Sequence, residues 1–221
     1  MTKTAKTLIW AWLVVLSLAV AGCWGAMKTS PDNPTGAGGL TPNVEDKDAG
    51  LVALAPGFDV RSYGVIAVDR FPVTDLAIKD EDDRKLAAEM QSYLQSELVR
   101  RLRDTGLFQR VVNLSEAEFK PEADKTLRLE GTITRLGGGS QVARAFWGAY
   151  GAGRTRAQAD MRFVEVPSGQ AMMVTADRRI ASVGFFGGAT RDHFRESFDD
   201  MARDLAKFLV RLSKGEAPRK D

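Results

Sequence analysis

The sequence predicts an α+β domain in two layers, a mixed sheet of four or five strands with two long helices packed on one face. Two amphipathic stretches, residues 80–105 and 192–213, are long enough to be those helices. Short β-branched or alternating runs precede and separate them, which is typical of strands. Because charged residues alternate with apolar ones in the later runs, we expect the second face of the sheet to be exposed to solvent.

The first helix is predicted by an apolar residue at every fourth position. These residues are Leu86, Met90, Leu94, Leu98 and Leu102. Acidic residues at 80–83 and arginines at 100, 101 and 103 complement the two ends of the helix dipole. Gly106 then supplies the left-handed residue that ends many helices. We therefore interpret the acidic run as helix-end electrostatics and not as a metal site.

Six runs are expected as strands or short strand pieces. They are residues 51–55, 63–71, 108–114, 126–136, 155–166 and 170–183. Pro167, Ser168 and Gly169 form a tight turn between the last two, which should therefore pair antiparallel. In the final helix one side is apolar, with Phe194, Phe198, Met201, Leu205, Phe208, Leu209 and Leu212.

The N-terminus has the parts of an export signal. Lys3 and Lys6 precede the apolar residues 8–21, a stretch shorter than the roughly 20 residues that cross a bilayer. It ends in Val-Ala-Gly-Cys at 20–23, the pattern of a lipobox, in which the chain is cut before Cys23 and this thiol carries the diacylglyceryl group. Cys23 is the only cysteine, which leaves no disulfide to explain it. The alternative is an uncleaved signal anchor.

These patterns predict the domain organisation. Residues 1–22 are a lipoprotein signal peptide, and 23–50 are the lipidated cysteine followed by a flexible tether poor in large apolar residues. Residues 51–215 form a single periplasmic domain, and 216–221 form a disordered tail. Without the signal peptide the chain has 29 basic and 29 acidic residues, so nucleic-acid binding has no overall electrostatic basis.

The residue after the lipobox cysteine bears on the location of the protein. It is Trp24 and not aspartate. By resemblance to enterobacterial lipoproteins, this implies transport to the outer membrane, with the acyl chains (palmitate among them) as the membrane anchor and the protein on the periplasmic face.

The segment 137–153 combines many glycines with three large aromatic residues, Phe146, Trp147 and Tyr150. In one interpretation the glycines form turns and the aromatic residues cap the edge of the sheet. In the other they form an adaptable apolar surface that binds a partner or touches the membrane. A second patch of this kind, residues 184–188, precedes the last helix.

Basic residues surround this segment. Residues 125–164 contain seven basic and two acidic side chains, and Arg144, Arg154 and Arg156 are the candidate polar rim of a binding surface. An ordinary solvated face of the sheet explains the same charges equally well.

Common catalytic patterns are missing from the sequence. His193 is the only histidine, so neither a Ser-His-Asp triad nor a zinc site of Cys and His ligands has the residues it needs. Glu130 and Asp160 on neighbouring strands could form the carboxylate pair of a cell-wall hydrolase. We expect no catalytic residues, no metal and no cofactor.

The order of these motifs resembles a known family. The lipobox, the short strand, the leucine-rich helix ending in Gly-Leu-Phe, Leu-Arg-Leu-Glu-Gly-Thr-Ile-Thr at 127–134, the glycine-rich run with Arg144 and the turn at Ser168 and Gly169 resemble bacterial lipoproteins of domain-of-unknown-function family 4410. The resemblance covers residues 63–212. The chain is more distantly similar to the curli secretion-channel subunit and to auxiliary lipoproteins of envelope transporters, which implies envelope assembly or transport without catalytic residues.

We therefore expect a non-enzymatic lipoprotein anchored in the outer membrane that binds an envelope partner, as an accessory part of a transport or assembly complex. The predicted partner-binding residues are Phe146, Trp147, Tyr150, Arg144, Arg154 and Arg156. One alternative is an oligomeric structural lipoprotein associated with a secretion pore, which would make the partner a second copy of the chain. The other is the carboxylate-based cell-wall hydrolase.

Overall fold

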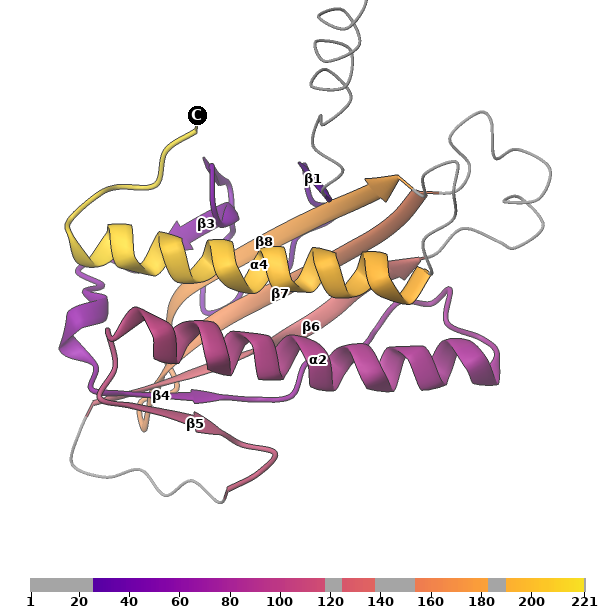
Figure 1. Ribbon diagram of the computed structural model, residues 1–221. Helices are drawn as coiled ribbons and strands as arrows, with labels where there is room; N and C mark the ends of the chain where they lie inside the picture. Colours follow the sequence, from indigo (N-terminus) through magenta and orange to yellow (C-terminus); the bar gives the residue numbers. More distant parts are fainter. Residues whose placement is uncertain (1–25, 118–124, 138–153, 183–189, 221) are drawn as a thin grey trace, which may run out of the picture.

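A computed structural model of the chain describes residues 26–117, 125–137, 154–182 and 190–220. These residues form one eight-stranded mixed sheet with two long helices across one face (Figure 1). The elements in chain order are β1 (Met27–Thr29), β2 (Val44–Asp46), β3 (Gly50–Leu54), the 3₁₀ helix η1 (Val60–Ser62), β4 (Val65–Val68), α2 (Glu81–Thr105), β5 (Arg110–Asn113), β6 (Thr126–Gly137), β7 (Arg154–Val166), β8 (Ala171–Ser182) and α4 (Thr190–Ser213).

The sheet has the spatial order β2-β3-β8-β7-β6-β4-β5, and β1 pairs with β8 beside this path. Strand β4 runs parallel to β5 and to β6, while the other pairings are antiparallel. The connection from β4 to β5 passes through α2, as a parallel pair requires a crossover of this length. The long hairpin strands β6, β7 and β8 form the centre of the sheet.

The prediction of four or five strands was wrong, because the sheet has eight. The α+β class and the two helices on one face agree with the structure (Figure 1). The strands missing from the prediction are β1 and β2, which have three residues each. Strands this short have no readable periodicity, and they exist because neighbouring backbone groups complete their hydrogen bonds.

The helices follow from their caps and their apolar stripes. The carboxylate of Asp80 accepts a hydrogen bond from the Asp83 N–H at 2.8 Å and begins α2, and Gly106 ends it with φ 65°. The core between helices and sheet contains large side chains with under 2 % exposure: Phe71, Phe163, Phe194, Phe198, Phe208, Ile66, Met90, Leu94, Leu98, Leu102, Leu127 and Leu129.

The second face of the sheet is covered in part by residues expected to be flexible tether. The backbone N–H of Asp32 donates to Gln158 at 2.7 Å, and that of Thr35 donates to the Asp160 carboxylate at 2.8 Å. Gln158 and Asp160 are consequently buried. The expectation of a wet face therefore does not hold around β7, because polar backbone in this segment pairs with the polar side chains of the sheet.

Asp46 in β2 ties the C-terminal part of the chain to the sheet. Burial disfavours the charged carboxylate, but hydrogen bonds from Arg211 and from the N–H groups of Arg219, Ala49 and Asp48 outweigh it and lower the pKa of Asp46. Two of these contacts, at 2.7 Å to Arg211 and 3.0 Å to Arg219, come from α4 and from the segment after it.

We expect Asp46→Asn to lower the free energy of unfolding at neutral pH by about 2 kcal/mol, because Arg211, whose side chain is 12 % exposed, loses one of its two carboxylate partners and keeps Asp48. A lowered folded pKa stabilises the protein fully above the unfolded value of 3.8 and is lost as the pH falls through the folded value. Urea unfolding from neutral to acidic pH should show a smaller acid loss in the variant than in the parent. Equal pH profiles would contradict this role for Asp46.

Candidate interaction site at one end of the sheet

Several chain segments leave the described domain at the same end of the sheet. Strand register places Met27 of β1 opposite Ile180 of β8, Ile180 opposite Arg156 of β7, and Arg156 opposite Gly137 of β6. Ser182, the last residue of β8, pairs with Arg154. We call this the loop end of the sheet, defined by Met27, Ile180, Arg156 and Gly137. The segments 138–153 and 183–189 both begin here, and so does the chain that leads back to Cys23 (Figure 1).

The connection between β4 and α2 adds a turn to the loop end. The Asp75 carboxylate accepts hydrogen bonds from the Leu136 N–H at 2.8 Å and from the Ala77 N–H at 3.0 Å. The Ile78 N–H donates to the Asp75 carbonyl at 3.1 Å and closes the turn. Asp75 is itself buried, so the turn is held against the end of β6.

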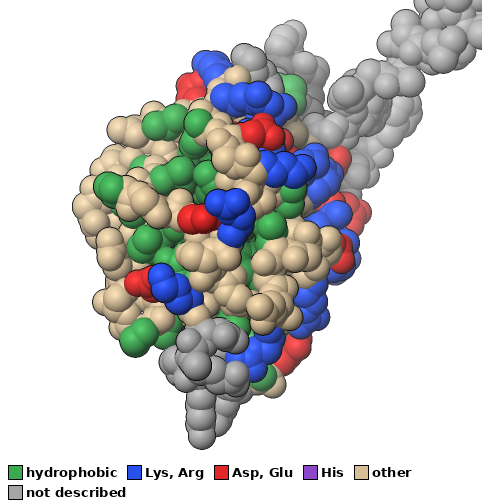
Figure 2. All heavy atoms as spheres, turned by 90° about the vertical axis from the view of Figure 1, so that its left-hand side faces the viewer, with side chains coloured by type: hydrophobic (Ala, Val, Ile, Leu, Met, Phe, Trp, Pro, Cys, Tyr) green, Lys and Arg blue, Asp and Glu red, His purple; other side chains and the backbone are tan. Residues whose placement is uncertain are grey.

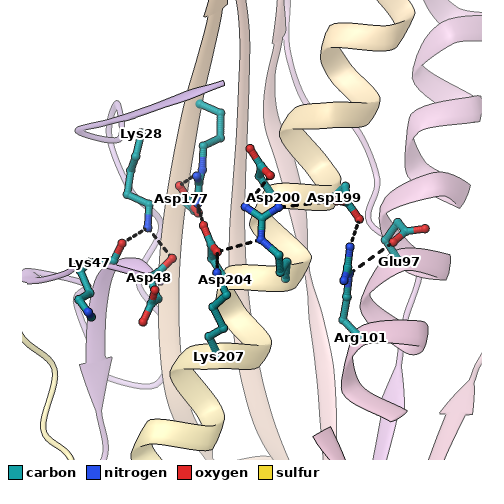
Figure 3. A network of polar contacts seen from close by, with 12 residues as sticks. Lys28, Lys47, Asp48, Glu97, Arg101, Asp177, Asp199, Asp200, Asp204 and Lys207 are labelled. Carbon is teal, nitrogen blue, oxygen red and sulfur yellow. Dashed lines mark hydrogen bonds and ion pairs between the residues drawn. The ribbon is translucent and has the colours of Figure 1, made fainter. Parts of the chain in front are cut away.

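Strand β1 is fastened to the sheet by side chains as well as by its ladder. The Lys28 ammonium donates to the carbonyls of Lys47, at 2.7 Å, and of Asp48 (Figure 3). Burial lowers the pKa of Lys28, and Arg179 lowers it further, while the nearby aspartates act in the opposite direction. Arg178 donates to the Asp32 carboxylate at 2.8 Å. These contacts hold residues 27–32 against the sheet, next to residue 26, the first described residue.

A buried ion-pair network lies beside β1, between β8 and α4 (Figure 3). Arg179, which is 4 % exposed, donates to Asp177 at 2.7 Å and to Asp204 at 2.9 Å. Burial alone would lower the pKa of Arg179, but the two carboxylates outweigh it and raise this pKa. Lys207 donates to the second oxygen of Asp204 at 3.0 Å. Every charge in this cluster has a partner, which indicates a structural role.

Two exposed large hydrophobic side chains lie at the loop end. Of the large hydrophobic residues in the described part of the chain, three are exposed: Met27 at 64 %, Val44 at 47 % and Leu76 at 88 %. Met27 belongs to the loop end, and Leu76 is the outward residue of the turn that Asp75 holds there. Viewed from the opposite end, the hydrophobic side chains form small groups separated by polar ones, and basic and acidic side chains lie next to each other along one side (Figure 2).

Most of the predicted site residues lie outside the described residues. These are Cys23, Arg144, Phe146, Trp147 and Tyr150, and the second patch at 184–188. Arg154 begins β7 and pairs with Ser182, and Arg156 is exposed on the same strand. The structure therefore brings the start of β7 next to the residues from which both glycine-aromatic segments depart.

The positive face expected from residues 125–164 is partly offset by acids, two of which come from elsewhere in the chain. Arg128 pairs with Asp69, and Arg135 lies 3.7 Å from Asp75. Arg162 pairs with Glu130 at 2.9 Å. A count over one stretch of sequence could not include Asp69 or Asp75, because they reach the strands only in the folded protein.

Sequence reasoning did not identify Met27, Lys28 or Leu76 as members of this site. Met27 and Lys28 were assigned to a tether, and Leu76 lies in a connection without periodicity. The signal available was one leucine in the connection after Pro72, and single exposed hydrophobic residues are common in proteins.

Glu130 and Asp160, the candidate carboxylate pair, line a shallow cavity of about 280 Å³ on the second face of the sheet. Asp160 is 4 % exposed and accepts hydrogen bonds from Thr35 and from Gln158, at 2.8 and 2.9 Å. Glu130 is bound to Arg162 at 2.9 Å. Both carboxylates are thus engaged in hydrogen bonds within the fold. A general acid or base must instead be free to reach the proton that it transfers.

The described residues, 26–117, 125–137, 154–182 and 190–220, contain neither a metal-ligand group nor a membrane-spanning helix. No group of three or more His, Cys, Asp or Glu side chains in these ranges is arranged to hold a metal ion. In the same ranges, neither helix is apolar enough over a sufficient length to cross a membrane.

The fold and the site define an α+β domain whose N-terminal connection and two glycine-aromatic segments share one end of the sheet. The sequence matches the family described as Domain of unknown function (DUF4410) over residues 61–191, and the chain belongs to this family. The family resemblance inferred from the motifs is confirmed. A comparison with curated protein sequences returns no match.

The comparison with solved structures returns matches at low sequence identity. PelC from Paraburkholderia phytofirmans, solved as a dodecamer, is 12 % identical, with a TM-score of 0.44 over 70 % of this chain and 95 % of that one. Protein XCC0632 from Xanthomonas campestris is 9 % identical, with a TM-score of 0.42 over 74 % and 92 % of the two chains. A candidate lipoprotein from Caulobacter crescentus CB15 is 14 % identical, with a TM-score of 0.30 over 72 % and 96 %.

Proposed function

We propose that this chain is a non-enzymatic lipoprotein, anchored by acyl chains on Cys23 to the periplasmic face of the outer membrane. It binds an envelope protein and acts as an accessory part of a transport or assembly complex. The segment 138–153, with Phe146, Trp147 and Tyr150, makes the contact, and arginines at its borders form the polar rim. The observation that carries this proposal is the shared departure of three chain segments from the loop end of the sheet.

The register of the strands supports a single contact region. Gly137 and Arg156 are paired, so the segment 138–153 starts and ends within one hairpin. Ser182 pairs with Arg154, so the segment 183–189, with its two phenylalanines, leaves from the neighbouring strand. Aromatic side chains and arginine are the residue types enriched at the centres of protein interfaces.

The rim of this region includes one described side chain. Arg156 is exposed at the loop end, opposite Gly137. Arg162 lies on the same strand and is also exposed, but it pairs with Glu130 farther along the sheet. The two arginines are therefore a matched pair, of which one belongs to the proposed contact region.

We expect a photoreactive residue at Trp147, activated in living cells, to form a discrete adduct with one envelope protein. Arg156→Glu should reduce the adduct severalfold, because it replaces a positive side chain at the rim of the contact with a negative one. Arg162→Glu should leave the adduct nearly unchanged. A photoreactive residue at the exposed Gln170, in the turn at the other end of β8, is the background control. Mass spectrometry identifies the protein in each adduct. The same adducts in equal amounts from positions 147 and 170 would contradict the proposal, and so would adducts only with a second copy of the chain.

A further inference from the structure

We infer that the loop end of the sheet rests on the surface of the lipid bilayer through Met27 and Leu76. This inference rests on the proposed lipidation of Cys23. It adds an orientation of the domain and a direct contact between protein side chains and lipid, neither of which lipidation requires.

The first step is the length of the chain between the lipid and the fold. Cys23 precedes Met27 by four residues, and an extended chain of that length spans at most about 14 Å. Met27 is already paired with Ile180 at the end of β8. The domain therefore has no long spacer, although the composition of residues 23–50 predicts one.

The second step is that this short connection cannot easily lengthen. Release of β1 would break the contacts of Lys28 with the two carbonyls of the β2–β3 turn. It would also expose Gln158, which makes two hydrogen bonds with the backbone of Asp32, at 2.7 and 2.9 Å. Arg178 would lose the Ser30 carbonyl, at 3.0 Å, as well as Asp32. With residues 27–35 released, Gln158 would keep its hydrogen bond to Asp160, but Lys28, Gln158 and Arg178 would all lose the partners named above.

The third step is the position of the exposed apolar residues. Met27 is separated from the end of β6 by three strand spacings, about 14 Å across the sheet. Leu76 projects beside the end of β6, because the Asp75 turn is bonded to Leu136 there. Two exposed apolar side chains thus lie at the end of the sheet from which the chain leads back to Cys23. A bilayer surface is the apolar partner that Cys23 necessarily brings within this reach.

The fourth step concerns charge. Lys79 is exposed near Leu76, but Glu81, Asp82 and Asp83 follow in the first turn of α2. The loop end therefore has no clear excess of positive charge around Leu76. We expect the contact to depend on apolar side chains and to form on neutral lipids without a requirement for anionic ones.

The test uses the lipidated full-length mature protein in vesicles of phosphatidylcholine and phosphatidylethanolamine. Cys23 is the only cysteine and its sulfur is acylated, so a cysteine introduced elsewhere is the single free thiol. An environment-sensitive fluorophore is attached in Met27→Cys, Leu76→Cys, Val44→Cys and Gln170→Cys. Lipids brominated on their acyl chains then quench any fluorophore that enters the bilayer.

Val44 is the matched control, because it is the third exposed large hydrophobic residue in the described part of the chain. It pairs with Val52, which pairs with Thr175, about 17 Å along β8 from Ile180. We expect quenching to be severalfold stronger at positions 27 and 76 than at 44 and 170. Adding phosphatidylglycerol should change this ratio little. In a Leu76→Asp protein labelled at position 27, the quenching should decrease, while Val44→Asp should have no effect.

The outcomes separate this inference from the proposed function. Similar weak quenching at all four positions of an acylated protein would overturn the membrane contact and leave the lipoprotein proposal intact. Strong quenching at 27 and 76 that disappears without anionic lipid would overturn the apolar mode of contact. A Cys23 found by mass spectrometry to carry no acyl chains would overturn both.

Discussion

Arg179→Met is expected to lower the free energy of unfolding by about 3–5 kcal/mol, because removing one partner of a buried ion pair leaves the other charges uncompensated. The guanidinium of Arg179 donates to Asp177 at 2.7 Å and to Asp204 at 2.9 Å, and it is the group that separates their carboxylates. Without it, two carboxylates face each other between β8 and α4, although Lys207 still contacts Asp204. Urea unfolding at neutral pH measures the loss.

The control for this prediction is an exposed ion pair between α4 and α2. Arg191, whose side chain is 59 % exposed, lies 3.1 Å from Glu89, and Arg191→Met should cost less than about 1 kcal/mol. The loss in Arg179→Met should also shrink on acidification. At acidic pH, protonation removes the buried negative charge that Arg179 balances, so less stability is lost without Arg179. Equal losses in the two variants, or a loss independent of pH, would contradict the role assigned to the network.

Gly131→Val should destabilise the domain by about 3 kcal/mol, the upper part of the range for overpacking a closely packed site. A Cβ at this position in β6 would lie 2.1 Å from the Asp160 carbonyl oxygen and 2.9 Å from the Met161 Cα. Both atoms are backbone of the neighbouring strand β7, so they cannot rotate away as a flexible side chain would. Thermal or urea unfolding of the variant gives the size of the effect.

The same strand offers a matched control. Gly137 ends β6, and a Cβ there would meet nothing within 4 Å. Gly137→Val should therefore be close to neutral, since valine itself suits a strand. A similar loss in both variants would show that the effect comes from strand propensity and not from the close approach of β7. The clash at Gly131 would also displace Asp160 and disturb the hydrogen bond that its carboxylate accepts from Thr35.

The long elements were predictable because each contains its own periodic signal. Helix α2 was expected at 80–105 and is observed at Glu81–Thr105, with Asp80 and Gly106 as its caps. Strands β7 and β8 were expected from their alternation and from the turn between them. Strands β1 and β2 were missed, because three residues are too few to show a period. In addition, β8, the pairing partner of β1, lies about 150 residues away in the chain.

The candidate site was only partly predictable for the same reason. Arg156 was identified from a local excess of basic residues, and it is exposed at the loop end. Leu76 and Met27 gain their significance only from the register that places them beside β6 and β8. Conversely, the expected positive face lost much of its charge once Asp69 and Asp75 were brought to the strands.

By itself the sequence determined the α+β class, both helices, the central strands and the family, because these depend on contacts and patterns within short stretches of chain. The tertiary structure decided the number of strands, the covering of the second face and the meeting of three segments at one end of the sheet. Those features depend on hydrogen bonds and ion pairs between residues far apart in the chain. Polar groups such as Lys28 and Gln158 meet their partners only when folding brings these distant segments together.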